Sequence, residues 1–160
     1  MLCAEEAIDR LSPYVNVLTA ARTILTNGAA ALVGEYELAG LERDNGEYHT
    51  KVIDLFEYGE AAFVPVYAGM TVFAAINTIL YDTNFDLVGE NEKSVRPDDW
   101  DVGYYGSLAI SGSAVWEAKG GAASRRSYWQ WYLKEAVPRA WDVFAPLQVK
   151  PVQVSPERSV

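Results

Sequence analysis

The longest apolar stretch of the chain covers residues 61–81, twenty-one positions without a charged side chain between Glu60 and Asp82. An α-helix of that length could cross a bilayer. Its flanks are acidic rather than basic, and a proline, an asparagine and two threonines dilute the run, which counts against a membrane span. We therefore predict a buried central helix at about 60–82, apolar on all faces because other helices surround it.

Small residues recur along this segment about every seven positions, which is two helical turns. Such a stripe lets the backbones of neighbouring helices approach closely, while larger side chains fill the other faces. The stripe consists of Ala61/Ala62, Ala68/Gly69 and Ala75, and the larger side chains are Phe63, Tyr67, Val72, Phe73, Ile76 and Leu80.

Apolar residues at helical spacing predict two helices at the start of the chain. Residues 4–11 form the first, which Ser12-Pro13 interrupts. Proline suits the first turn of a helix and serine suits the position before it, so Pro13 opens the second helix with Ser12 as its cap. Asn27-Gly28 is expected to end this second helix.

Two further helices are predicted before the central one. The first covers 29–43 and ends at a turn signal, Asp44-Asn45-Gly46. The second covers 47–58 and ends at Gly59. Its apolar residues at helical spacing are Tyr48, Val52, Leu55 and Phe56.

The chain changes character after the central helix. Residues 82–101 hold seven carboxylates against two basic residues, and we predict a long acidic connection with at most one turn of helix. An apolar pattern resumes over 102–116, where Gly103, Gly106 and Gly112 allow close packing.

The last clear helix is predicted at 123–144, after a break at Gly120-Gly121. Pro138 should bend this helix, because a proline inside a helix removes one hydrogen bond and crowds the preceding turn. Further prolines follow the helix and indicate extended chain. These elements predict an all-α fold, with a single-domain helical bundle over residues 1–145 and an extended C-terminal tail over 146–160.

Charge and cysteine content narrow the class of protein. A formal net charge of −9 argues against nucleic acid or an anionic membrane as partner, since like charges repel. The one cysteine, Cys3, excludes an internal disulfide and fits a reducing compartment. The N-terminus MLCAEEAIDR lacks the basic start and apolar run of a signal peptide, so we expect a cytoplasmic location.

The residues that carry enzyme chemistry are sparse and scattered. A cysteine–histidine pair would need Cys3 and His49 to meet, and nothing else in the sequence supports that pairing. The carboxylates of 82–92 lack the regular spacing of a calcium loop, and the glycines of 103–112 lack the lysine and the strand of a phosphate-binding loop. We therefore predict no enzyme activity, no metal site and no cofactor.

Acidic residues adjoining large aromatic side chains form the least explained feature. Asp98-Asp99-Trp100-Asp101 runs into Tyr104-Tyr105, and Trp116-Glu117 follows. Exposed rings beside charge serve protein interfaces as anchors and steering groups. The rings could instead belong to the core, with the carboxylates capping a helix that begins near residue 102.

Several stretches of the chain together resemble one protein family. KVIDLFEYGEAAFVPVYAGMTVFAAINTILYD precedes the acidic connection, PDDWDVGYYGSLAISGSAVWE follows it, and RRSYWQWYLKEAVPRAW closes the domain. This order resembles the fifth numbered immunity family of bacterial polymorphic toxin systems, in which an aromatic-rich helix carries a W-x-W-Y-L-x-E-A-V/I-P stretch. The resemblance covers roughly residues 50–142, and the motif corresponds to Trp129–Pro138.

The resemblance implies a protein that binds and neutralises a cognate toxin domain, and it carries over no catalytic residue. Many such toxins act on nucleic acid and are basic around their active sites, so carboxylates of an acidic chain can stand in for phosphates. We predict that the acidic connection forms much of the contact face. The predicted protein-binding residues are Asp82, Asp86, Glu90, Glu92, Asp98, Asp99, Trp100 and Asp101.

Two other classes of function stay open. A non-catalytic helical protein could bind a small molecule in a pocket of Tyr and Trp side chains, which ligand-dependent quenching of tryptophan fluorescence would show. A homo-oligomer could bury the 61–81 helix between subunits, which a concentration-dependent mass in solution would show. The sequence does not determine the oligomeric state.

Overall fold

The computed structural model describes residues 1–81, 101–112 and 121–144, and all regular structure in these ranges is helical. The predicted all-α fold class is confirmed. Nearly all of the predicted acidic connection lies outside the described residues, as do the end of the helix predicted at 102–116 and the C-terminal tail. The division into one domain and an extended tail therefore stays a prediction.

Helices of three kinds follow one another along the chain. In order they are α1 (Leu2–Ala7), the 3₁₀ helix η1 (Ile8–Leu11), α2 (Val15–Leu32), α3 (Leu38–Ile53), the 3₁₀ helix η2 (Asp54–Ala62), α4 (Phe63–Tyr81), α5 (Asp101–Ser111), α6 (Ala122–Trp131), the π-helical turn η5 (Tyr132–Ala136) and α7 (Val137–Phe144). No loop separates α3, η2 and α4, although Gly59 kinks the chain within η2, and α6, η5 and α7 join end to end.

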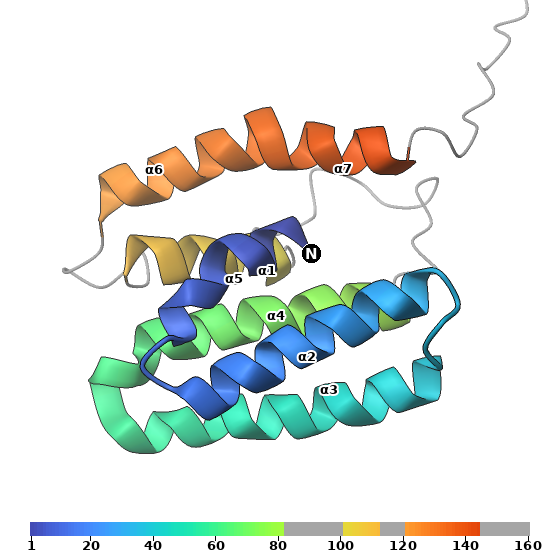
Figure 1. Ribbon diagram of the computed structural model, residues 1–160. Helices are drawn as coiled ribbons and strands as arrows, with labels where there is room; N and C mark the ends of the chain where they lie inside the picture. The colour runs from blue at the N-terminus through green and yellow to red at the C-terminus, as the bar shows by residue number, and fades with distance from the viewer. Residues whose placement is uncertain (82–100, 113–120, 145–160) are drawn as a thin grey trace, which may run out of the picture.

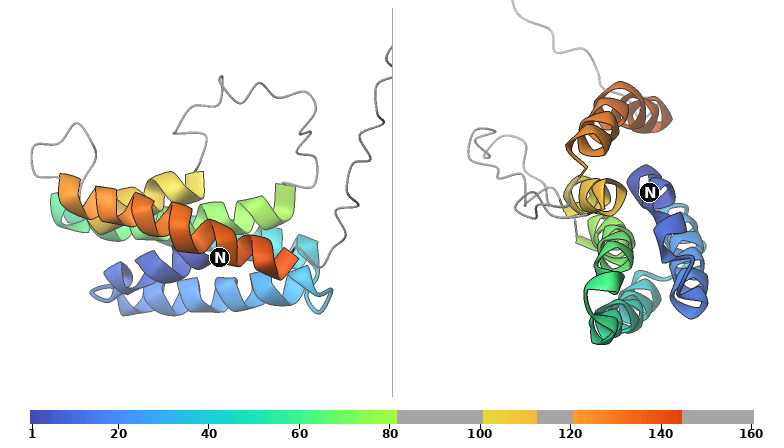
Figure 2. Two further views of the ribbon diagram at one scale, coloured as in Figure 1. Left: turned by 90° about the horizontal axis from the view of Figure 1, so that it is seen from above. Right: turned by 90° about the vertical axis from the view of Figure 1, so that its left-hand side faces the viewer.

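The helices are stacked in layers. α2, α3 and α4 pack against one another as one group, α1 and α5 cover one side of that group, and α6 with α7 forms the outermost layer (Figures 1 and 2). α5 connects the outer layer to the centre, because it packs against α4 on one side and α6 on the other.

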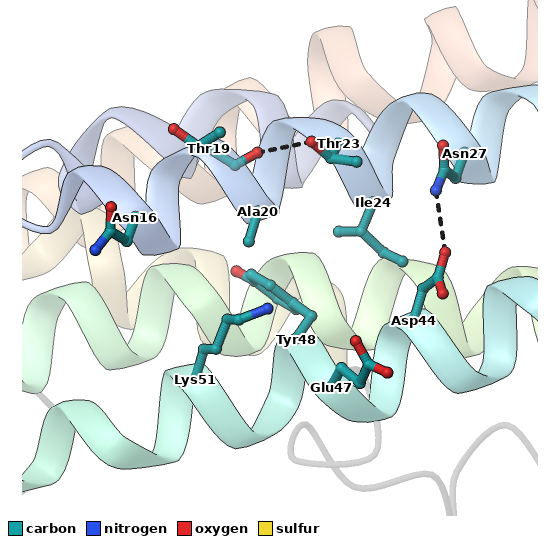
Figure 3. A pocket seen from close by; sticks show the side chains of 10 residues that line it. All are labelled: Asn16, Thr19, Ala20, Thr23, Ile24, Asn27, Asp44, Glu47, Tyr48 and Lys51. Atoms are coloured by element: carbon teal, nitrogen blue, oxygen red, sulfur yellow. Dashed lines mark hydrogen bonds between the residues drawn. The ribbon is translucent and has the colours of Figure 1, made fainter.

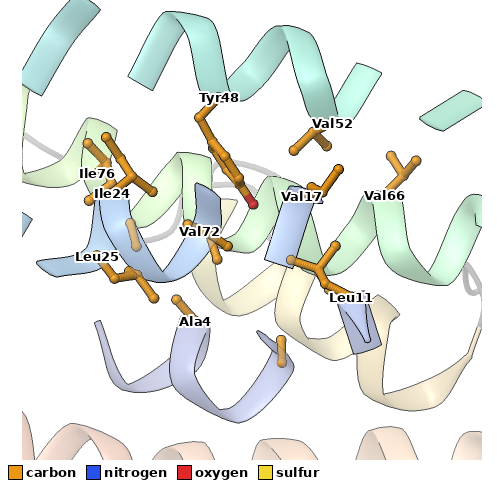
Figure 4. Close-up of a cluster of buried hydrophobic side chains, with 14 of the residues drawn as sticks. Ala4, Leu11, Val17, Ile24, Leu25, Tyr48, Val52, Val66, Val72 and Ile76 are labelled. Atoms are coloured by element: carbon orange, nitrogen blue, oxygen red, sulfur yellow. The ribbon is translucent and has the colours of Figure 1, made fainter. Parts of the chain in front are cut away.

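α4 is the buried central helix that the uncharged stretch predicts. It packs against α1, α2, α3 and α5 and against both η1 and η2. Figure 4 shows Val66, Val72 and Ile76 of α4 in a core that they share with side chains of α1, η1, α2 and α3. Each fully buried side chain of this size stabilises the fold by about 1.5–3 kcal/mol. The buried positions of α4 are Pro65, Val66, Ala68, Gly69, Thr71, Val72, Ala74, Ala75 and Ile76.

The apolar character of this region also meets the criteria for a membrane span. By length and composition the helical run Leu38–Tyr81 could cross a membrane, and half of its most apolar 18-residue window is buried inside the fold. The core helix of a soluble protein meets the same criteria. In this chain the packing of α4 against its neighbours accounts for its composition.

The predicted end of a helix at Asn27-Gly28 is wrong, because α2 continues through it to Leu32. Gly28 is buried and faces α4. A Cβ at Gly28 would lie 2.6 Å from the end of the Ile76 side chain, so the missing side chain lets α2 and α4 approach closely. The glycine is explained by packing rather than by a turn.

The predicted turn at Asp44-Asn45-Gly46 is also wrong, because α3 runs through it. Asn45 is buried, and its amide donates hydrogen bonds to the side chain of Asn77 at 2.9 Å and to the carbonyl of Phe73 at 3.4 Å. A buried amide needs such partners. Asn45 therefore fixes α3 against α4.

The connection between α2 and α3 lies at residues 33–37 instead. Gly34 adopts a positive φ of 77°, which suits glycine at the end of a helix. The amide of Glu35 donates to the carbonyl of Ala30 at 2.8 Å, and the amide of Gly34 donates to Ala31 at 3.1 Å. This pair of bonds is a Schellman motif, which satisfies the last carbonyls of α2.

The predicted cap of the second helix is a further correction. α2 begins at Val15, and Tyr14 before it makes no side-chain capping hydrogen bond. Ser12 and Pro13 form a turn in front of the helix, where the amide of Ser12 donates to the carbonyl of Asp9 at 3.1 Å.

The chain tightens after α3 and then turns into α4. A 3₁₀ helix has three residues per turn rather than 3.6, so the side chains of η2 no longer follow the face set by α3. Leu55 stays buried, whereas Phe56 is 48% exposed. Gly59, with φ of 70° and ψ of −154°, makes the predicted break before α4.

The predicted last helix is present from Ala122 to Phe144. Pro138 has no amide hydrogen for the carbonyl of Lys134, and its ring crowds that carbonyl. The residues before it, Tyr132–Ala136, widen into a π-helical turn. The distortion expected at Pro138 therefore occurs in the turn that precedes it.

Candidate functional site

Most of the predicted contact face lies outside the described residues. This applies to Asp82, Asp86, Glu90, Glu92, Asp98, Asp99 and Trp100, and only the backbone of Asp101 is described, at the first position of α5. Tyr104 and Tyr105 follow it in α5, where both are half-buried and their rings meet edge to face at 5.8 Å. The carboxylates of this segment could form a contact face or cap a helix, and both roles stay predictions.

A groove of about 320 Å³ runs between α2 and α3 (Figure 3). Tyr48 lies between the two helices, and its hydroxyl donates to the carbonyl of Gly69 at 3.3 Å. Burial raises the pKa of Tyr48, so its hydroxyl stays neutral and cannot act as a base. The groove offers amides, hydroxyls and charged groups for hydrogen bonding. Its lining residues are Asn16, Thr19, Ala20, Thr23, Ile24, Asn27, Asp44, Glu47, Tyr48 and Lys51.

Asp44 lies at one end of this groove and binds three side chains. It accepts hydrogen bonds from the Tyr36 hydroxyl at 2.5 Å, the Asn27 amide at 3.2 Å and the Arg43 guanidinium at 3.1 Å. The bond from Tyr36 is the main reason that the pKa of Asp44 lies below its usual range. The carboxylate thus ties the α2–α3 connection to both helices.

Cys3 and His49 have separate surroundings. The ring of His49 stacks on Phe73 with centroids 4.2 Å apart. Cys3 is a buried free thiol whose pKa is raised by burial, and the Tyr128 hydroxyl is its polar neighbour. Within residues 1–81, 101–112 and 121–144, no group of three or more His, Cys, Asp or Glu residues is placed to hold a metal ion.

The aromatic motif of the last helix packs against α5. A Cβ at Gly106 would overlap the hydroxyl of Tyr128, and a Cβ at Gly103 would touch the ring of Trp129 at 3.4 Å. The predicted packing role is confirmed for these two glycines, whereas Gly112 has a φ of 80° and ends α5. The most recognisable part of the sequence therefore contributes to holding the outer layer in place.

Sequence reasoning missed an exposed surface on η2, which we call the acidic corner. It consists of the exposed side chains of Asp54, Phe56, Glu57, Tyr58 and Glu60. Carboxylates alternate here with aromatic rings, the same combination that drew attention to Asp98–Asp101. The helical spacing of Phe56 with Val52 hid this signal, because a regular α-helix would have kept Phe56 on the buried face.

Comparison with known proteins gives a match to a protein family. No curated protein and no solved structure matches the chain. A family model described as "Immunity protein Imm5" matches residues 16–139. The match extends from α2 into α7 and so includes the part of the chain before residue 50, where the resemblance in sequence did not reach. Because it covers most of the 160 residues, the chain belongs to the Imm5 immunity protein family.

Proposed function

We propose that this protein binds and neutralises a cognate toxin domain made by the same cell or its kin. The observation that carries the proposal is the family match over residues 16–139. The charge of the chain supports a basic partner. Residues 1–81 alone hold eleven carboxylates against four basic side chains, and such an imbalance attracts a basic surface and speeds its association.

The acidic connection at 82–101 belongs to the contact face in this proposal. Its seven carboxylates would occupy sites on the toxin that otherwise bind the phosphates of nucleic acid. Trp100 would contribute the aromatic anchor that such interfaces use.

Co-expression tests the function directly. The tagged chain is produced together with the C-terminal toxin domain encoded beside it, and we expect a stable complex on purification and restored growth. If neither appears, the proposal is wrong.

Replacing Asp98, Asp99 and Asp101 together by Asn should slow association and reduce its dependence on salt. An unchanged rate and salt slope would remove these residues from the contact face without contradicting immunity.

A further inference from the structure

We propose that the acidic corner on η2 is a docking surface for a basic face of the toxin domain. The inference rests on the proposed function and names a contact surface within the described residues. It draws on three observations: exposed aromatic rings, carboxylates aligned beside them, and the distribution of charge over the molecule.

The rings of the acidic corner are exposed, yet neighbouring rings hold them in place. Phe56 and Tyr58 are 48% and 65% exposed. Phe56 meets Phe63 edge to face with centroids 6.0 Å apart, and Tyr58 lies against Tyr14 at 5.2 Å. Large rings with few rotatable bonds lose little conformational entropy on binding, so they are suited to be the central contacts of an interface.

Carboxylates stand beside these rings because of the local helix type. In a 3₁₀ helix residues three apart lie one above the other, so Asp54 aligns with Glu57 while Ile53 aligns with Phe56. Ile53 is 40% exposed and extends the apolar row. The sequence contains no basic residue between Lys51 and Lys93, so all charged side chains within the acidic corner itself are negative.

The charges of the described helices favour this side for a basic partner. α3 and η2 lie on the face of the molecule opposite α6 (Figure 1). The helical run of α6, η5 and α7 carries four basic residues against two acidic ones, whereas the helices of residues 1–81 are strongly acidic. A basic protein is therefore attracted to the α3–η2 side and repelled from the α6 side.

A protein with a basic surface fits these features better than other partners do. Nucleic acid and anionic lipid would be repelled by the carboxylates. A second copy of the chain docking through the same face would bring Asp54 and Glu57 against their own equivalents, and like charges across an interface are unfavourable. Rings flanked by carboxylates instead match a partner that presents Lys or Arg around an apolar pocket.

The experiment measures association and dissociation rates against the purified, catalytically inactive toxin domain encoded beside this chain. The variant Asp54→Asn with Glu57→Gln removes the aligned carboxylates and keeps their shape. We expect association about tenfold slower at low salt, with a weaker dependence on salt. The separate variant Phe56→Ala should dissociate at least about tenfold faster, because it removes a central aromatic contact.

Matched controls separate local contacts from general effects. Glu35→Gln with Glu37→Gln makes the same change in charge at the other end of α3, on exposed residues, and Leu133→Ala removes an apolar side chain that is 64% exposed on η5. Both controls should stay within roughly twofold of the wild-type rates. Thermal melting of each variant checks that it is folded.

Each outcome bears on a defined claim. If the wild-type chain binds the toxin domain and the acidic-corner variants behave like their controls, the corner is not the docking surface and the immunity function still stands. If the wild-type chain does not bind, the proposed function falls and this inference with it. A dimer of the chain alone that Phe56→Ala dissociates would assign the corner to self-association and overturn the proposal.

Discussion

Glycine serves two opposite purposes in α3 and α4. Gly46 is exposed in the middle of α3, and a Cβ placed there would meet no heavy atom within 4 Å. Gly69 is buried in α4, where a Cβ would lie 2.7 Å from both methyl groups of Val52. Because valine is branched at Cβ, its methyl groups cannot easily turn away.

Alanine at these two positions should change stability in opposite directions. Gly46→Ala should raise the free energy of unfolding by about 1 kcal/mol, because alanine has less conformational freedom to lose in a helix. Gly69→Ala should lower it by about 1–3 kcal/mol, because the core is overpacked. Urea denaturation of both variants beside the wild type measures the two changes. A stabilised Gly69→Ala would mean that α3 and α4 can separate at little cost.

Asn45 is an example of a residue whose structural role cannot be predicted from the neighbouring sequence. Asn-Gly is a strong turn signal in isolation. In this chain the amide of Asn45 binds Asn77, thirty-two residues further along, and that partner is known only once α3 and α4 are set side by side. The buried helix at 61–81 can be predicted from the sequence alone, because a helix without charged residues has no face that needs contact with water.

At the scale of elements, α5 connects the outer layer to the core. α6 packs against α5, and the side chain of Tyr128 covers Gly106. Tyr128 is buried, so its ring has little room to move. Its hydroxyl is buried too, and the thiol of Cys3 is its polar neighbour.

Gly106→Ala should therefore destabilise the fold by about 1–3 kcal/mol, because the new Cβ overlaps the Tyr128 hydroxyl. Tyr128→Phe removes that oxygen, and with it the atom that the new Cβ would overlap. In the double variant the cost should be partly relieved, and a double-mutant cycle measures the coupling. Additive effects would show that Gly106 matters for a reason other than Tyr128.

The change of helix type at Asp54 explains why only part of the candidate site could be predicted. At Asp98–Asp101 acidic residues adjoin an aromatic ring, and no regular spacing competes with the interpretation as a contact surface. In η2 the same combination follows a helical pattern, which places Phe56 on one face with Val52. Nothing local in the sequence marks the switch from 3.6 to three residues per turn in η2.

For the molecule as a whole, buried acidic groups predict loss of stability in alkali. Burial raises the pKa of Cys3, Tyr48, Tyr128 and Tyr132 above their ordinary values. The folded chain keeps these protons at a pH where the unfolded chain releases them, from about 8.5 for cysteine and about 10 for tyrosine. Their contribution to stability is complete below those values and falls as the pH rises through them toward the folded pKa values.

Urea midpoints measured between pH 7 and pH 11 should therefore fall steadily above about pH 9. Tyr48→Phe should make the fall of the midpoint with pH less steep, because phenylalanine has no hydroxyl proton to release on unfolding. A midpoint that is constant up to pH 11 would contradict the assignment of these groups as buried and neutral.

Because of the layered arrangement, tryptophan fluorescence can be used to follow one part of the fold separately from the rest. Three of the five tryptophans belong to the run of α6, η5 and α7, the other two are Trp100 and Trp116, and the first 99 residues contain none. The three tryptophans of the outer layer therefore report on its attachment, while far-ultraviolet circular dichroism is dominated by the helices of residues 1–81. Two unfolding curves that coincide would identify one cooperative unit, and curves that separate would show the outer layer leaving the central group first.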